Sequence, residues 1–183
     1  TLQPYVRKFM AKYPKTNLSI EYLDSGDIYE RILTGSIDIG VVAIPRKDRN
    51  IEVFPFQSEQ LVFVCAREHQ LANHSEMDIH LLQGQKFIAF EEGVPTRNLI
   101  TRILTQYNVT VRIIMQFDNI ETIKRAVEIN AGVSILPETA IRTELANGTL
   151  TAMGFSNESF FRPTGVIVRK NRDISLAGRY LIE

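Results

Sequence analysis

Side chains capable of covalent or acid-base chemistry occur in this 183-residue sequence, but their spacing matches no catalytic motif. There is no GxSxG elbow, P-loop, HExxH pair or GxGxxG turn after a strand. Glu91 and Glu92 form an acidic pair at a loop start, where carboxylates are usually solvated. His69, His74 and His80 lie five and six residues apart without a nearby cysteine. We therefore expect no enzyme activity, no cofactor and no metal site.

Hydrogen-bonding side chains recur where helices are predicted to begin, at Thr1, Ser25, Thr96 and Asn119. The first turn of a helix has unpaired N–H groups and a partial positive charge, so it attracts anions. Arg97 is the cation beside these positions that could pair a carboxylate, sulfate or phosphate. Ser25 and Asn119 fit equally well as caps of their own helices, and Arg97 fits better as a surface residue.

The stretch 117–137 indicates most clearly how such groups are positioned. Asp118 and Asn119 are N-cap residue types ahead of apolar residues at helical spacing, which predicts a helix of about three turns. Gly132 is expected to end that helix in the left-handed conformation, and a short buried strand follows from Val133. Ligands of parallel sheets lie outside the carboxyl ends of the strands. Asn119 is expected at such an edge, with Gly132 and Val133 close by.

The rest of the chain alternates between predicted strands and helices. Helices are predicted at 2–13, 25–34, 77–82, 96–107, 138–146 and from 175 onward, and strands at 18–22, 37–44, 51–56, 61–66, 86–90, 111–117, 150–155 and 162–169. The run 37–44 is almost continuously apolar, so we expect a central parallel strand that is buried on both faces. This alternation predicts an α/β fold with helices on both faces of mostly parallel sheets.

Three segments resemble the effector-binding domain of LysR-type transcriptional regulators. They are the opening TLQPYVRKFMAKYP, the run LSIEYLDSGDIYERILTGSIDIGVVAI and the stretch DNIETIKRAVEINAGVSILP, in the family's order and over nearly the whole chain. The resemblance implies two Rossmann-like lobes in the periplasmic-binding-protein-like (type 2) fold, with a cleft between them. Lobe one would comprise 1–57 plus 156–183 and lobe two 58–155. It also implies a strand ahead of Thr1 and a separate DNA-binding domain, which this sequence does not include.

The resemblance further implies a sensor of a small metabolite, and helix N-termini at the cleft favour an anionic one. In such a domain the predicted helix starts converge on the cleft, and the positions expected to face the effector are Thr1, Leu2, Ser25, Gly26, Thr96, Arg97, Asn119, Gly132 and Val133. Members of the family bind promoter DNA through an N-terminal winged helix-turn-helix and form homodimers or homotetramers. The helix 2–13 is expected to meet a lobe-two helix of a second copy.

Composition and charge are consistent with this interpretation. The 21 basic and 21 acidic residues balance, so nothing overall attracts the chain to nucleic acid or to an anionic membrane. No apolar run approaches the ~20 residues of a membrane span and no signal-type segment opens the chain, so a cytoplasmic location is expected. The single cysteine, Cys65, lies in the apolar run LVFVCA and is expected to be buried and unreactive.

Two other functions share the expected fold. One is a solute-binding protein that serves a transporter, which the absence of a signal segment and the short chain disfavour. The other is an enzyme on the same scaffold, such as a deaminase-like member of the binding-protein fold, which no motif supports.

Overall fold

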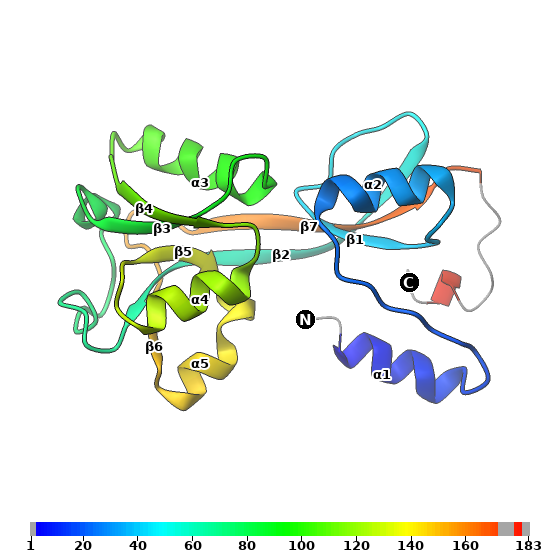
Figure 1. Cartoon of the computed structure of the whole chain (residues 1–183), viewed down its shortest axis with the longest axis horizontal. Coiled ribbons are helices and arrows are strands. Elements are labelled where there is room, and N and C mark those ends of the chain that lie inside the picture. Colours follow the sequence, from blue (N-terminus) through cyan, green and yellow to red (C-terminus); the bar gives the residue numbers. More distant parts are fainter. Residues whose placement is uncertain (1–2, 172–177, 181–183) are drawn as a thin grey trace. The chain divides into compact units, whose positions relative to one another are not determined.

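The computed structural model, which describes residues 3–171 and 178–180, divides into two compact units joined by two crossings of the chain (Figure 1). Unit 1 consists of Thr1–Gln57 and Pro163–Glu183, and unit 2 is the continuous stretch Ser58–Arg162. The return crossing therefore falls between Arg162 and Pro163, later than the boundary at 155 expected from the sequence. Each unit has its own cluster of buried apolar side chains.

Apart from the short helical segment 178–180, the described part of unit 1 contains two helices, one whole strand and parts of two others. Its elements are α1 (Gln3–Lys12), α2 (Ser25–Thr34), β1 (Gly40–Ala43), the start of β2 (Ile51–Ala66) and the end of β7 (Phe160–Arg169). Asp24 caps α2, because its Oδ1 accepts the N–H of Asp27 at 2.9 Å, and Gly35 ends the helix at a φ of 79°. The buried face of α2 then packs on β1, β2 and β7 through the cluster Tyr29, Ile32, Val42, Ile51 and Ile167.

Unit 2 contains a parallel β-α-β-α-β arrangement. Its elements are η1 (Ile79–Leu82), β3 (Lys86–Phe90), α3 (Pro95–Gln106), β4 (Arg112–Phe117), α4 (Ile120–Glu128), β5 (Ser134–Pro137), η2 (Glu138–Ala140), α5 (Arg142–Asn147) and β6 (Leu150–Met153). β3 pairs in parallel with β4 on one side and with Val133 on the other. Figure 1 shows α3 and α4 on opposite sides of these strands. This is expected because the connection from β3 to β4 and the connection from β4 back to Val133 run in opposite directions along the sheet, and both are right-handed.

The larger sheet has the order β1-β7-β2-β5, with β6 also paired to β2. The pairs β1/β7, β2/β5 and β2/β6 are all antiparallel, so the expectation of mostly parallel sheets holds only for the surroundings of β3. The prediction of a central parallel strand at 37–44 is wrong. β1 covers four residues and is the end strand of this sheet. Its one strand partner, β7, comes from much later in the chain and runs antiparallel to it. The two strands predicted at 51–56 and 61–66 form one 16-residue strand, β2.

The strand predicted at 18–22 from alternating apolar residues is also wrong. Among the described residues this segment pairs with no strand, and Ile20 and Tyr22 are 46% and 91% exposed. Alternating residues do not form a stable strand without a hydrogen-bonded neighbour. The helix predicted at 138–146 is divided into η2 and α5. Of the last predicted helix, 178–180 are helical and 175–177 and 181–183 lie outside the described residues.

Gly132 does not end α4 in the left-handed conformation, contrary to the prediction. The positive φ of 56° falls on Asn130, an amino acid whose short polar side chain tolerates this conformation. Gly132 is needed because the backbones come close: a Cβ here would lie 2.6 Å from the carbonyl oxygen of Lys86. The residue therefore permits the parallel contact between Val133 and the amino end of β3.

We predict that Gly132→Ala lowers the free energy of unfolding by about 1–3 kcal/mol, the usual cost of forcing a methyl group into a packed site. Gly154→Ala is the matched control, because the nearest atom to a Cβ there would be the Gln60 amide nitrogen at 3.7 Å, an ordinary contact distance. Urea unfolding of both variants measures the difference. Equal midpoints for Gly132→Ala and the control would contradict this account of the close approach.

Candidate functional site

The carboxyl ends of β3 and β4 lie at one edge of unit 2, and α3 and α4 begin directly after them. The Glu91 N–H donates to the Phe117 carbonyl at 2.9 Å, which ties the two strand ends together. Asn119 caps α4, as predicted, because its Oδ1 accepts the N–H of Thr122 at 2.9 Å. Two helix N-termini therefore meet at one sheet edge, the position where ligands of parallel sheets bind.

The N-terminus of α3 is the more open of the two to an anion. Its N-cap is Val94 and its first residue is Pro95, so no side chain caps the helix. Thr96, where this helix was predicted to begin, is the second residue of α3 and does not cap it. The first turn of α3 has no acidic residue, whereas α4 carries Glu121 in its first turn. The partial positive charge of α3 is therefore not offset by a carboxylate of its own.

A buried polar cluster surrounds the Thr96 hydroxyl. Arg162 Nη1 donates to Thr96 Oγ1 at 3.1 Å, and Arg162 Nε donates to Glu59 Oε2 at 3.0 Å. Arg162 Nη2 also pairs with the same oxygen of Glu59. The other oxygen of Glu59 accepts the Thr139 hydroxyl at 2.6 Å. Thr96 is 1% exposed, and the side chains of Arg162 and Glu59 are each 10% exposed, so the cluster is almost withdrawn from water.

Glu59, Thr139 and Arg162 were not among the predicted site residues. Glu59 and Arg162 are 103 residues apart and come together only because β2 and β7 are neighbours in the sheet. Arg162 carried a signal, because it is a charged residue at the start of the apolar strand predicted at 162–169 and buried charges need partners, whereas Glu59 lies in the polar run 57–60 between two predicted strands and carried none. The sequence could therefore have suggested that Arg162 needs an ionic partner, although not that the partner is Glu59.

Arg97 is half-buried and is held at the same strand edge. Its Nη1 donates to the Phe90 carbonyl at 2.8 Å and to Gln116 Oε1 at 3.3 Å. The side chain therefore connects the ends of β3 and β4 and brings a positive charge to the start of α3. Its burial and contacts differ from the surface position that sequence analysis favoured.

Gly132 and Val133 lie at the other end of β3 from these groups. Val133 accepts from the Ile88 N–H and donates to the Lys86 carbonyl, both at 2.8 Å. Because the strands are parallel, this register sets Val133 beside the amino end of β3 and away from Asn119. The expectation that these residues lie close to Asn119 is wrong, since the strand following α4 begins at the opposite edge.

Ser25 and Gly26 form the first turn of α2 in unit 1, but Asp24 caps this helix and the proposed cap at Ser25 is wrong. Asp27 adds a second carboxylate to that turn. The two carboxylates offset the partial positive charge of the helix, which makes this N-terminus unfavourable for an anion. Thr1 and Leu2 lie outside the described residues.

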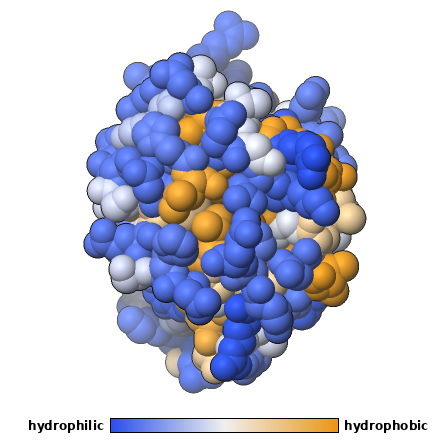
Figure 2. Space-filling model, turned by 90° about the vertical axis from the view of Figure 1, so that its left-hand side faces the viewer, coloured by the Kyte–Doolittle hydropathy of each residue, from blue (hydrophilic) through white to orange (hydrophobic). Residues whose placement is uncertain are grey.

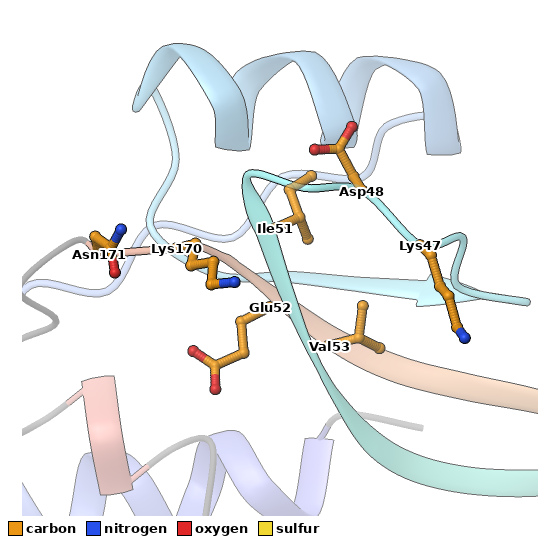
Figure 3. Close-up of a pocket in the computed structure, with 7 residues that line it drawn as sticks. All are labelled: Lys47, Asp48, Ile51, Glu52, Val53, Lys170 and Asn171. Carbon is orange, nitrogen blue, oxygen red and sulfur yellow. The ribbon is translucent and has the colours of Figure 1, made fainter.

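A pocket of about 480 Å³ lies in unit 1 between β2 and the end of β7 (Figure 3). It is lined by Lys47, Asp48, Ile51, Glu52, Val53, Lys170 and Asn171. Figure 3 shows the two lysines and two acidic residues around the apolar Ile51 and Val53. Charges of both signs cancel here, and Asp48 already accepts the Asn50 N–H at 2.8 Å. The pocket therefore has no evident preference for a charged ligand.

Lys124 fastens α4 to the following elements of unit 2. Its buried ammonium group contacts Glu121 and Glu144 at 2.8 and 2.9 Å and donates to the Ala140 carbonyl at 3.1 Å. Burial lowers the pKa of Lys124, but hydrogen bonds to Glu121 and Glu144 outweigh it and the pKa is raised. This ion pair holds the first half of α4 against α5, which fixes the orientation of the α4 N-terminus.

Cys65 lies fully buried in β2, as predicted, and burial raises the pKa of its thiol to about 11.

Within the described residues no group of three or more histidine, cysteine or acidic side chains is placed to bind a metal ion. None of the described helices has the length and apolar character needed to cross a membrane.

Comparison with known proteins gives consistent matches over the whole chain. A family model described as the LysR substrate binding domain matches residues 1–183. The HTH-type transcriptional regulator CysL of Bacillus subtilis is 23% identical over 166 residues, which are 91% of this chain and 56% of CysL. A probable RuBisCO transcriptional regulator of Trieres chinensis is 28% identical over 167 residues, 87% of this chain and 54% of that protein. The chain thus spans little more than half of these relatives.

Solved structures also superpose on nearly the whole chain. The Synechocystis CcmR regulatory domain in complex with 2-PG superposes with a TM-score of 0.87 at 25% identity, covering 99% of this chain and 89% of that one. The effector binding domain of QuiR in complex with shikimate has a TM-score of 0.88 at 20% identity, covering 99% and 86%. These likenesses confirm the expected fold class.

We predict that Cys65 reacts with iodoacetamide at pH 8 roughly 100-fold more slowly in the folded chain than in urea, where the thiol has its ordinary pKa. A raised pKa means that the reactive thiolate forms only as the pH approaches 11, so the protection should hold throughout the neutral range. Mass spectrometry of the alkylated chain measures both rates. Equal rates in folded and unfolded chain would contradict a buried, inert thiol.

Proposed function

The chain belongs to the LysR substrate-binding domain family, and from this membership we propose that it is the effector-sensing part of a LysR-type transcriptional regulator. The relatives named above are transcriptional regulators of nearly twice the length. We propose that the whole protein is cytoplasmic and reads promoter DNA through a further domain. The same comparisons favour a regulator over a solute-binding protein of a transporter, and binding over catalysis.

We propose that the effector is a small anion and that it binds at the start of α3. The observation that carries this proposal is the uncapped first turn of α3, which has no carboxylate of its own. The guanidinium of Arg97 is held at the same strand edge by Phe90 and Gln116. Thr96 and the Asn119-capped start of α4 complete the proposed site, whereas Asp24 and Asp27 argue against an equal role for α2.

Regulation would follow from linkage between binding and conformation. A ligand that binds one arrangement of the two units more tightly shifts the population toward it. The shift is limited by the difference between the two affinities, and DNA binding must in return alter affinity for the effector. The structural element common to both units is the pair of crossing strands, β2 and β7, through which such a change would be transmitted.

We also propose that the chain self-associates, using α1 and the edge strand β4. Apolar side chains reach the surface in patches among hydrophilic ones on the face drawn in Figure 2. Met10 on α1 is 55% exposed, and on β4 Ile113, Ile114 and Met115 are each about two-fifths exposed. In the described structure β4 has a strand partner on one side only, which leaves backbone groups free to pair with another chain. A second copy is the occupant that the family favours.

For the anion site, we predict that inorganic phosphate or 2-PG raises the stability of the chain, by about 2.7 kcal/mol at one hundred times the dissociation constant. Thr96→Val removes a hydroxyl at constant volume and should weaken binding roughly tenfold or more, because hydrogen bonds to charged groups are the stronger ones. Thr101→Val on the exposed part of the same helix is the control and should bind as the wild type does.

Calorimetric titration measures each affinity, and urea unfolding without ligand measures stability separately. If Thr96→Val binds as tightly as Thr101→Val, the start of α3 is not the anion site. If neither anion binds the wild-type chain, the proposal of an anionic effector at this edge is wrong.

For assembly, we predict that the wild-type chain sediments as a dimer or larger at micromolar concentration. Met115→Lys should shift the chain toward monomer, because it places a charge in an apolar contact. Leu81→Lys is the matched control, since Leu81 is as exposed as Met115 but lies on η1. A wild-type chain that remains monomeric at these concentrations would refute self-association through these surfaces.

A further inference from the structure

The Thr96 hydroxyl has a donor that the rest of the cluster leaves unused. A threonine hydroxyl has one hydrogen to donate and two lone pairs to accept with. In the described structure one lone pair accepts from Arg162 at 3.1 Å, and the hydrogen has no acceptor. The oxygen thus has a partner in Arg162, but the residue is 1% exposed and a buried donor that is left unused is costly. This buried donor at the start of α3 calls for an acceptor supplied by something else.

The hydrogen bonds of the cluster fix which group donates and which accepts in each contact. The Thr139 hydroxyl donates to Glu59, and Arg162 donates to both Glu59 and Thr96. Because Arg162 is a donor in every contact, Thr96 has to act as the acceptor in this contact, and its own hydrogen must point elsewhere. The guanidinium also polarises the hydroxyl, which strengthens the hydrogen bond that the hydroxyl can donate.

We propose that Arg162 is a positioning residue for the effector: it fixes Thr96 as a hydrogen-bond donor to a bound anion, while Glu59 and Thr139 fix Arg162. This inference rests on the proposed anion site at α3 and goes beyond it by naming the residue that makes the Thr96 hydroxyl a hydrogen-bond donor to the anion. Arg162 does not touch the ligand and acts only through Thr96. Its charge is balanced by Glu59, so the long-range attraction for anions comes from α3 and Arg97.

A purely structural role for Arg162 has a different consequence. Glu59 would be a buried, unpaired carboxylate without Arg162, so Arg162→Met alone should damage the fold and cannot separate the two roles. The double variant Glu59→Gln/Arg162→Met removes both charges and restores neutrality. If Arg162 only neutralises Glu59, the double variant binds anions normally. If Arg162 positions Thr96, binding stays weak even though the fold is restored.

Arg162→Lys provides a second test that does not depend on the double variant. Lysine keeps the positive charge beside Glu59, but its compact ammonium lacks the rigid fork that reaches Glu59 and Thr96 together. Combining Arg162→Lys with Thr96→Val then tests whether Arg162 acts through Thr96. Coupled residues give non-additive effects, so once the hydroxyl is gone, replacing Arg162 should have no further effect on affinity.

The experiment is calorimetric titration of the chain with inorganic phosphate and with 2-PG, alongside urea unfolding of each variant. We expect Arg162→Lys and Glu59→Gln/Arg162→Met each to bind these anions roughly ten- to a hundredfold more weakly than the wild type does. This is the range for a lost hydrogen bond to a charged group. We expect Arg162→Lys to leave the affinity of Thr96→Val unchanged.

Wild-type affinity in Arg162→Lys or in a folded double variant overturns the inference but leaves the anion site intact. Additive losses in the combined variant also overturn it, since Arg162 would then act independently of Thr96. Absence of binding to the wild-type chain overturns the proposed anion site and this inference with it.

Discussion

β3 has parallel hydrogen-bonded neighbours on both sides, and this pairing decides where everything else in unit 2 can lie. β4 fixes one side along its whole length and Val133 fixes the other. The register directs the starts of α3 and α4 to one edge, and the lack of a side chain at Gly132 allows the second contact to form. The candidate site therefore depends on backbone geometry at the opposite end of the same strand.

The elements of unit 2 could be predicted because their signals are local. Apolar spacing and an amide cap at Asn119 are sufficient to define α4, and Pro95 marks the start of α3 within one residue. The sequence could not indicate which residue would take the left-handed conformation after α4, because Gly132 and Asn130 both permit it. Close packing against Lys86 accounts for Gly132, and such a contact has no trace in the local pattern.

The errors in unit 1 and in the site have a different cause. The strand expected at 18–22 and the central place expected for β1 both depended on partners that come from distant parts of the chain. The same limit applies to Arg162, whose role arises only when β7 lies beside β2. Residues at helix starts were found from their types, whereas the buried pair that orients one of them required the sheet order.

Unit 1 closes only when β7 has been made. β1 pairs with β7, whereas unit 2 is one uninterrupted segment between them. At ~5–20 residues per second, a ribosome would take roughly 6–25 s to proceed from β1 to β7. During this interval unit 2 can fold while residues 40–43 still lack their strand partner. Nascent chains would therefore expose the unfinished sheet of unit 1 to chaperones until β7 has been synthesised.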